Sequence, residues 1–114
     1  MIVVYGLKNC DSCRKALKWL AAEGLTARLV DVRAEPPTRE TVAAWCRAVG
    51  WETLLNRRGT TWRGLDDAAK AEVDESRAID LIVAHPALMK RPLIENGGRV
   101  TVGFDARVQA SLGH

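Results

Sequence analysis

The sequence lacks the long apolar and basic runs of membrane and nucleic-acid-binding proteins. No stretch approaches the roughly 20 apolar residues that a membrane-spanning helix requires. The opening residues MIVVYGLKNC have neither the positive region nor the long apolar region of a signal peptide. No run of Lys and Arg is long enough for an arm that binds nucleic acid. We therefore expect no membrane contact, no direct contact with nucleic acid, and a cytoplasmic location.

Cysteine is also scarce. Three cysteines leave an odd one over, which does not fit the disulfide framework of a small secreted protein. The three cysteines and two histidines lack the paired spacings of a zinc site, so no metal is expected. In a reducing cytoplasm, a close pair such as Cys10 and Cys13 is more often catalytic or redox-sensing than structural.

The length and the charge of the chain suit one small domain. Its 114 residues are close to the commonest domain size, and they contain no repeats and no linker long enough to separate domains. We predict a single domain over residues 1–114 and a monomer. The net charge of +3 can attract a small anion or an acidic peptide.

The first third of the chain predicts a strand, a helix and a strand. Residues 2–5 are β-branched and aromatic and end at Gly6, as in a buried strand. A helix is expected from Cys10 or Asp11 to about Glu23, and residues 27–32 form a second strand. The helix carries one apolar stripe of Cys13, Ala16, Leu17 and Leu20. Two strands joined by a helix are expected to pair in parallel.

The middle of the chain is predicted to be helical. A helix is expected between Thr38 and Gly50, with its apolar stripe formed by Val42, Trp45, Cys46 and Val49. Residues 51–84 are expected to hold a short turn, the polar segment 56–63 and two more helical stretches. The second of these covers residues 76–84 and ends at His85.

The last part predicts a β-hairpin and a final helix. Residues 92–95 and 99–104 flank the tight turn at residues 96–98, and a helix follows over residues 105–112. The element order is β-α-β, a helical segment, then β-β-α. This is the order of an α/β thioredoxin-like fold with a mixed sheet and a helical insertion at about residues 38–85.

Cys10 is predicted to be the reactive residue. It lies between the end of a strand and the start of a helix, where free N–H groups and the helix dipole favour a thiolate. Lys8 and Arg14 add positive charge nearby. Cys13 follows one helical turn later, at the separation from which a resolving thiol can close a disulfide with Cys10. The alternative is that Cys13 is only a small apolar residue of the helical stripe.

The other side chains that could belong to a site are Cys46, Arg58 and Arg91. Cys46 lies in an apolar stripe and is expected to be buried and inert. Arg91 precedes Pro92 at the start of a strand, where a thioredoxin-like fold holds a cis-proline beside its active cysteine. Arg58 lies in a Gly-Thr-Thr segment whose donors suit an anion or a carboxylate. The alternative for both arginines is a solvated surface.

Two motifs resemble a known family. The segment HPALMKRP at residues 85–92 closely resembles the HPxLxxRP signature of the arsenate reductase (ArsC) and Spx family. The segment YGLKNC at residues 5–10 resembles that family's nucleophile loop. LLNRRGTTWR at residues 54–63 and VGF at residues 102–104 look like the YffB-type branch. The resemblance implies a thioredoxin-like fold in which Cys10 is the nucleophile and Arg91 lies over it before a cis Pro92.

The resemblance to arsenate reductases is incomplete at the anion site. Those enzymes place three arginines around the cysteine, and only Arg91 has a clear counterpart here. Asn56 stands at the second position, with Arg57 or Arg58 as the nearest substitute, and Gly103 or its neighbour stands at the third. Gly6 occupies about the place of a histidine that those enzymes carry before the cysteine. Fewer charge-assisted contacts weaken the hold on a tetrahedral oxyanion.

The leading hypothesis is therefore a thiol reductase that depends on glutathione or a dithiol. Cys10 attacks a mixed disulfide, and Cys13 or glutathione resolves it, with no bound cofactor. Lys8, Asn9, Arg58 and Arg91 orient the anionic partner beside Pro92. Expected partners are glutathione, a protein thiol or disulfide, and glutaredoxin.

Three alternatives stand beside this hypothesis. The first is an arsenate reductase coupled to glutaredoxin and glutathione. The second follows the Spx regulators, which use the pair as a redox switch while they bind RNA polymerase. The third is a folded domain without activity.

Overall fold

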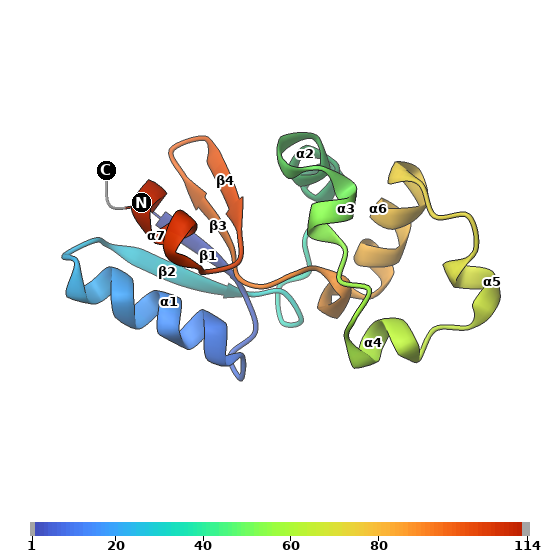
Figure 1. The fold of residues 1–114 in the computed structure, drawn as a ribbon, viewed down its shortest axis with the longest axis horizontal. Helices are drawn as coiled ribbons and strands as arrows, with labels where there is room; N and C mark the ends of the chain where they lie inside the picture. The colour runs from blue at the N-terminus through green and yellow to red at the C-terminus, as the bar shows by residue number, and fades with distance from the viewer. Residues whose placement is uncertain (1, 113–114) are drawn as a thin grey trace. The chain divides into compact units, whose positions relative to one another are not determined.

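A computed structural model describes residues 2–112, which form two units (Figure 1). Residues 2–35 and 91–112 are built on a β-sheet and are called the sheet unit below. Residues 36–90 are called the helical unit. The helical stretch predicted at about residues 38–85 falls within the helical unit, and the assignment of one domain to the whole chain remains a prediction.

The sheet unit contains a four-stranded mixed sheet. Its strands lie in the order β2-β1-β3-β4, with β1 parallel to β2 and antiparallel to β3. The element bounds are β1 Ile2–Gly6, α1 Asp11–Ala22, β2 Ala27–Asp31, β3 Leu93–Asn96, β4 Arg99–Val102 and α7 Ala106–Leu112. The β-α-β and β-β-α halves match the element order predicted from the sequence, and the thioredoxin-like α/β fold is confirmed.

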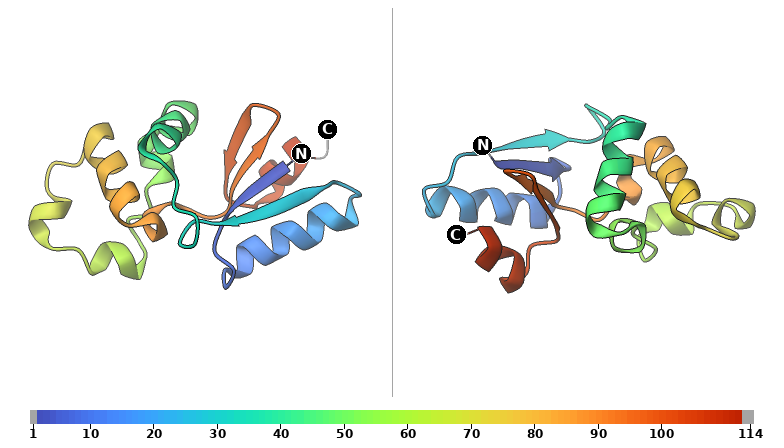
Figure 2. Two further views of the ribbon diagram at one scale, coloured as in Figure 1. Left: turned by 180° about the vertical axis from the view of Figure 1, so that it is seen from behind. Right: turned by 90° about the horizontal axis from the view of Figure 1, so that it is seen from above.

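One face of the sheet carries the core of this unit. Alternate residues of β1 point to the same face, and Ile2 and Val4 pack there with Ile94 of β3. Ala16 and Leu20 of α1 and Val108 and Leu112 of α7 cover them. Both helices therefore lie on the same side of the sheet, as the right-hand view of Figure 2 shows.

The hairpin between β3 and β4 depends on two glycines. Asn96 pairs with Arg99, so that Gly97 and Gly98 form a two-residue loop. Their φ angles are +56° and +88°, a conformation that glycine adopts at little steric cost. The turn predicted from the sequence is confirmed, and β3 begins one residue later than expected because Pro92 lies outside the strand.

The helical unit contains more short helices than the sequence predicted. Its elements are α2 Arg39–Val49, α3 Trp51–Leu54, α4 Thr60–Arg63, α5 Asp67–Lys70, α6 Glu75–Ala84 and the 3-10 helix η1 Pro86–Leu88. The segment at residues 56–63 was described from the sequence only as polar, and the structure shows that it includes α4. The Arg63 guanidinium donates to the Arg58 carbonyl at 2.8 Å, which holds this turn together.

The helices α2 and α6 provide most of the core of the helical unit. Val42, Trp45 and Cys46 of α2 are buried, as the predicted stripe requires, and Val49 is partly exposed.

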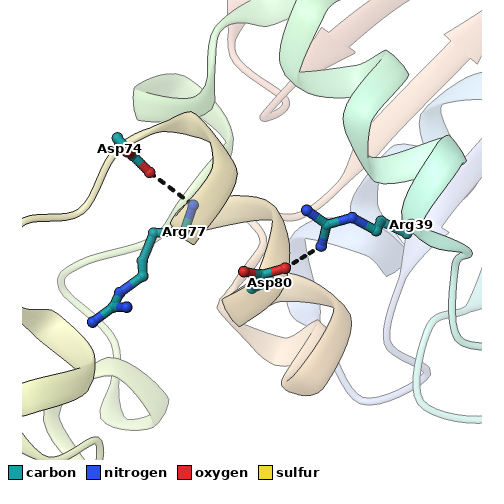
Figure 3. Close-up of polar contacts among 4 residues, drawn as sticks. All are labelled: Arg39, Asp74, Arg77 and Asp80. Carbon is teal, nitrogen blue, oxygen red and sulfur yellow. Dashed lines mark hydrogen bonds and ion pairs between the residues drawn. The ribbon is translucent and has the colours of Figure 1, made fainter.

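Polar contacts also join the helices of this unit. Arg39 of α2 forms an ion pair with Asp80 of α6, and Asp74 accepts a hydrogen bond from the Arg77 N–H (Figure 3). Because the paired side chains are 53% and 60% exposed, the ion pair stabilises the unit by about 1 kcal/mol at most.

Membrane-spanning helices and metal clusters are both absent from residues 2–112. None of the helices in this range has the length and apolar character that crossing a membrane requires. The same residues contain no cluster of three or more His, Cys, Asp or Glu side chains that could hold a metal ion.

Candidate active site

Cys10 lies at the N-terminus of α1, where the sequence placed it. It is the N-cap residue, with extended φ and ψ of −89° and 119°, and its backbone N–H donates to the Leu7 carbonyl at 3.1 Å. The side chain is half-buried. The thiol thus lies next to the free N–H groups of the first helical turn and is open to a reacting partner.

The surroundings of Cys10 favour its thiolate. Partial burial by itself raises the pKa of a thiol, but the neighbours of Cys10 outweigh that effect and lower its pKa below the ordinary value. The Cys13 N–H and the Cys13 thiol donate hydrogen bonds to the sulfur. The positive charge of Arg91 and the Ser12 N–H act in the same direction. A lowered pKa is the property that a nucleophilic thiol needs at neutral pH.

Cys13 is in the opposite state. It is completely buried, and this burial raises the pKa of its thiol to about 12. A hydrogen bond from the Leu7 N–H favours the Cys13 thiolate but does not overcome the burial. Cys13 therefore keeps its proton and donates it towards Cys10. The two cysteines form an unequal pair, with one half-buried thiol of lowered pKa and one fully buried thiol of raised pKa.

Gly6 leaves the space in which the Cys13 sulfur lies. A Cβ atom added at Gly6 would overlap Cys13 Sγ and would lie 3.4 Å from Cys13 Cβ and 3.9 Å from Arg91 Cβ. The last residue of β1 must therefore lack a side chain if Cys13 is to stay beside Cys10. The arsenate reductases that the sequence resembles carry a histidine at about this place. Here the position is glycine because a side chain would occupy the space of the Cys13 sulfur.

Gly6→Ala is expected to push the Cys13 thiol out of its place. Overpacking of this kind costs about 1–3 kcal/mol of folding free energy, and the Cys10 pKa should rise because its Cys13 donors move. Chemical denaturation and alkylation of Cys10 as a function of pH measure the two effects. Gly64→Ala is the steric control, because Gly64 has a φ of −78° and its added Cβ would meet no atom closer than 3.4 Å. An unchanged Cys10 pKa in Gly6→Ala would contradict the expectation.

Arg91 and Pro92 precede β3 and belong to the same unit as Cys10. The Arg91–Pro92 peptide bond is cis, as the resemblance implied. Pro92 is buried, and its carbonyl accepts a hydrogen bond from the Gly103 N–H at 2.8 Å. Arg91 is half-buried, and its charge lowers the pKa of both Cys10 and Cys13. The structure thus brings together Cys10, Cys13, Arg91 and Pro92.

Lys8 and Asn9 are exposed residues of the loop that leads to Cys10. The Lys8 backbone is held on both sides, since its N–H donates to Asp31 Oδ2 at 3.1 Å and its carbonyl accepts from Arg14 Nε at 3.1 Å. Asp31 was not among the residues predicted from the sequence. Asp31 lies near the end of a strand that was predicted to run parallel to the strand before Cys10. Because the ends of parallel neighbouring strands meet at the same edge of a sheet, this position could have indicated a residue close to the Cys10 loop.

Arg58 belongs to the helical unit, and its role at Cys10 remains a prediction. Its N–H donates to Asn56 Oδ1 at 3.0 Å, and its side chain is exposed. The Arg57 guanidinium lies 5.7 Å from the centre of the Trp51 ring. Cys46 of the same unit is buried with a raised thiol pKa caused by that burial, which confirms the buried thiol expected there.

Known proteins resemble the chain over nearly its whole length. The ArsC family matches residues 5–110. The solved structure of a YffB protein is 44% identical, with a TM-score of 0.92 and 97% of each chain covered. An uncharacterised protein of Haemophilus influenzae is 39% identical over 94% of each chain. The global transcriptional regulator Spx of Streptococcus pyogenes is 28% identical over 92% of this chain and 79% of its own length.

These likenesses agree with the motifs around Cys10 and Arg91. The matched range includes the whole nucleophile-loop motif from Tyr5 to Cys10 and the Arg91–Pro92 segment. The likeness to YffB also agrees with the sequence motifs at residues 54–63 and 102–104. The chain therefore belongs to the ArsC family, in its YffB-type branch.

Proposed function

We propose that the protein is a thiol reductase that reduces mixed disulfides with electrons from glutathione or a protein dithiol. Membership of a thiol oxidoreductase-like family supports the general class of reaction. The observation that carries the proposal is the unequal pair, in which the pKa of Cys10 is lowered and that of Cys13 is raised. A nucleophile that attacks from outside and a buried thiol that acts second are the two parts that disulfide exchange needs.

The reaction would begin at the half-buried thiol of Cys10. The Cys10 thiolate attacks one sulfur of a mixed disulfide, forms a new disulfide with it, and releases the other sulfur as a thiolate. Cys13 then loses its proton and attacks Cys10 Sγ, which releases the second thiol and leaves a Cys10–Cys13 disulfide. A dithiol, or two glutathione molecules, reduces that disulfide and returns both cysteines to thiols. In the alternative route, glutathione itself resolves the first adduct.

Positive charge would orient the anionic partner. Glutathione carries carboxylates, and Arg91 places a half-buried guanidinium beside the reacting sulfur. Lys8 and Asn9 are exposed residues on the same loop as Cys10, and their side chains can meet the partner. Arg58 is assigned to the same partner as a prediction. A guanidinium can make two parallel hydrogen bonds to one carboxylate, which supplies orientation as well as charge.

The proposal is tested by trapping adducts on the Cys13→Ser variant. If Cys13 resolves the mixed disulfide, this variant should accumulate a covalent adduct with a glutathionylated peptide, at near one equivalent per chain by intact mass spectrometry. The wild type should show almost none, because Cys13 releases the adduct. Cys10→Ser is the matched control and should form no adduct. Equal adduct levels in the wild type and Cys13→Ser would leave only the glutathione-resolved route.

Arsenate reduction is the second candidate, and membership of the ArsC family favours it. The Arg91 charge beside Cys10 supplies one of the contacts that an arsenate oxyanion needs. Asn56, and Gly103 or its neighbour, stand where the arsenate reductases that the sequence resembles have two further arginines, so we expect weak arsenate turnover. The test is arsenate-dependent oxidation of glutathione in the presence of glutaredoxin. A rate equal to that of Cys10→Ser would exclude this function.

A redox-switched regulator is the third candidate, and the likeness to Spx favours it. Cys10 and Cys13 could close a disulfide as the switch, and RNA polymerase would be the partner. Binding to purified RNA polymerase, measured with the reduced and the oxidised protein, tests this candidate. Equal binding in the two states would exclude a switch based on this pair.

A further inference from the structure

We propose that Asp31 is a positioning residue for Cys10, because its carboxylate fixes the loop that holds the nucleophile against the first turn of α1. The inference rests on the proposed function only in taking Cys10 as the reacting thiol. Neither the motifs nor the family likeness assigns a role to Asp31. All of the contacts involved lie within the sheet unit.

The Asp31 carboxylate joins two segments of the chain. Asp31 is the last residue of β2 and pairs with Gly6, the last residue of β1. Its Oδ2 accepts a hydrogen bond from the Lys8 N–H at 3.1 Å. Its Oδ1 accepts from the Arg33 N–H at 2.9 Å and from the Ala34 N–H at 3.2 Å. One side chain therefore ties the nucleophile loop to the turn that follows β2.

The carboxylate is charged at neutral pH. The hydrogen bond from the Lys8 N–H is the largest cause that lowers the pKa of Asp31, and the bonds from the Arg33 and Ala34 N–H groups act in the same direction. Hydrogen bonds to a carboxylate are stronger than those to a neutral acceptor. The tie to Lys8 is therefore present over the pH range in which a thiol exchanges disulfides.

The constraint on Lys8 is passed to Cys10 through the backbone. The loop between them spans two peptide bonds, and the Cys10 N–H donates to the Leu7 carbonyl at 3.1 Å. Leu7 also supplies the N–H that bonds Cys13 Sγ. The loop thus contacts both thiols, and its movement would draw Cys10 away from the Ser12 and Cys13 N–H groups that lower its pKa.

Charge and position predict opposite effects when Asp31 is replaced. A negative charge near a thiol raises the pKa of that thiol, so loss of the Asp31 charge alone would lower the pKa of Cys10. Loss of the loop anchor removes N–H donors from the Cys10 sulfur, which raises the pKa. The sign of the change therefore separates a positioning role from a simple electrostatic one.

The experiment is alkylation of Cys10 by iodoacetamide as a function of pH, followed by mass spectrometry of the Cys10 peptide. Asp31→Ala is expected to move the midpoint towards the free thiol value of about 8.5. At a pH below both midpoints, a variant whose midpoint is higher by one pH unit has about tenfold less thiolate and should react more slowly, although its thiolate is the stronger nucleophile. Asp31→Asn should give a smaller change, since its amide oxygen can keep the contacts of one carboxylate oxygen while its NH₂ group cannot accept an N–H.

Glu35→Ala is the charge-matched control, because it removes one carboxylate from the same exposed segment and leaves Asp31 in place. It is expected to leave the midpoint unchanged or slightly lowered. Circular dichroism confirms that each variant is folded, and Asp31→Asn carries the test if Asp31→Ala does not fold. An unchanged or lowered midpoint in folded Asp31→Ala would overturn the proposal, as would the same result in Asp31→Asn if Asp31→Ala does not fold.

The outcome is independent of disulfide turnover. Alkylation reports the state of the Cys10 thiol without a disulfide substrate. If Asp31→Ala raises the midpoint but the wild type reduces no mixed disulfide, the positioning role stands and the proposed function fails. If the wild type reduces mixed disulfides but Asp31→Ala does not raise the midpoint, the proposed function stands and the positioning role fails.

Discussion

Cys10→Ser is expected to reduce the rate of mixed-disulfide reduction to that of glutathione alone, a loss on the order of a thousandfold. A serine hydroxyl remains protonated at neutral pH and cannot take part in disulfide exchange. The measurement is reduction of a glutathionylated peptide with excess glutathione. Cys46→Ala, which removes a buried thiol of the helical unit, should retain the wild-type rate. A Cys10→Ser variant with substantial activity would show that another group is the nucleophile.

Alkylation of Cys10, like its attack on a disulfide, should depend on pH. Only the thiolate reacts, so the rate of alkylation increases as the pH rises through the Cys10 pKa and then reaches a plateau. Because that pKa is lowered, the midpoint should lie below the ordinary thiol value of about 8.5. Cys13 should not react with the reagent in the native protein, since its thiol is buried and its pKa is raised to about 12. A Cys10 midpoint at or above the ordinary value would contradict the activated thiol.

Arg91→Ala is expected to decrease kcat/KM for a glutathionylated substrate by about 10- to 100-fold. This range corresponds to the loss of one hydrogen bond to a charged group, about 1.5–3 kcal/mol. Two effects combine, because the Cys10 pKa rises when the positive charge is removed and the anionic partner loses an orienting contact. Alkylation measures the first effect, and the change in KM measures the second.

Arg91→Lys separates the charge of Arg91 from its shape. The ammonium keeps the positive charge beside Cys10, so the pKa should stay close to that of the wild type. It lacks the planar pair of donors that binds a carboxylate, so KM should remain raised. An Arg91→Ala variant with unchanged pKa and unchanged KM would exclude a role for this residue at Cys10.

Local patterns in the sequence were enough to find the elements of the sheet unit. The β-branched run at residues 2–5 and the stripe through Cys13, Ala16 and Leu20 predicted the first strand and helix to within one or two residues. The two glycines at residues 97–98 predicted the hairpin. These features depend on neighbours that are close in the chain, and so a pattern can reveal them. The helical unit was less predictable, because α3, α4 and α5 have four residues each and carry little periodic signal.

The order of residues alone establishes that Cys10 follows a strand, begins a helix and precedes Cys13 by one turn. Through the Arg91–Pro92 motif it also indicates which family the chain belongs to. The tertiary structure decides the rest. It buries Cys13 and leaves Cys10 half-buried. It also places the Cys13 sulfur in the space beside Gly6 and brings the Asp31 carboxylate to the Lys8 N–H. Burial and hydrogen bonds between residues far apart in the chain arise from the packing of strands and helices. The chemistry of a thiol depends on that packing, because burial and nearby donors set its pKa.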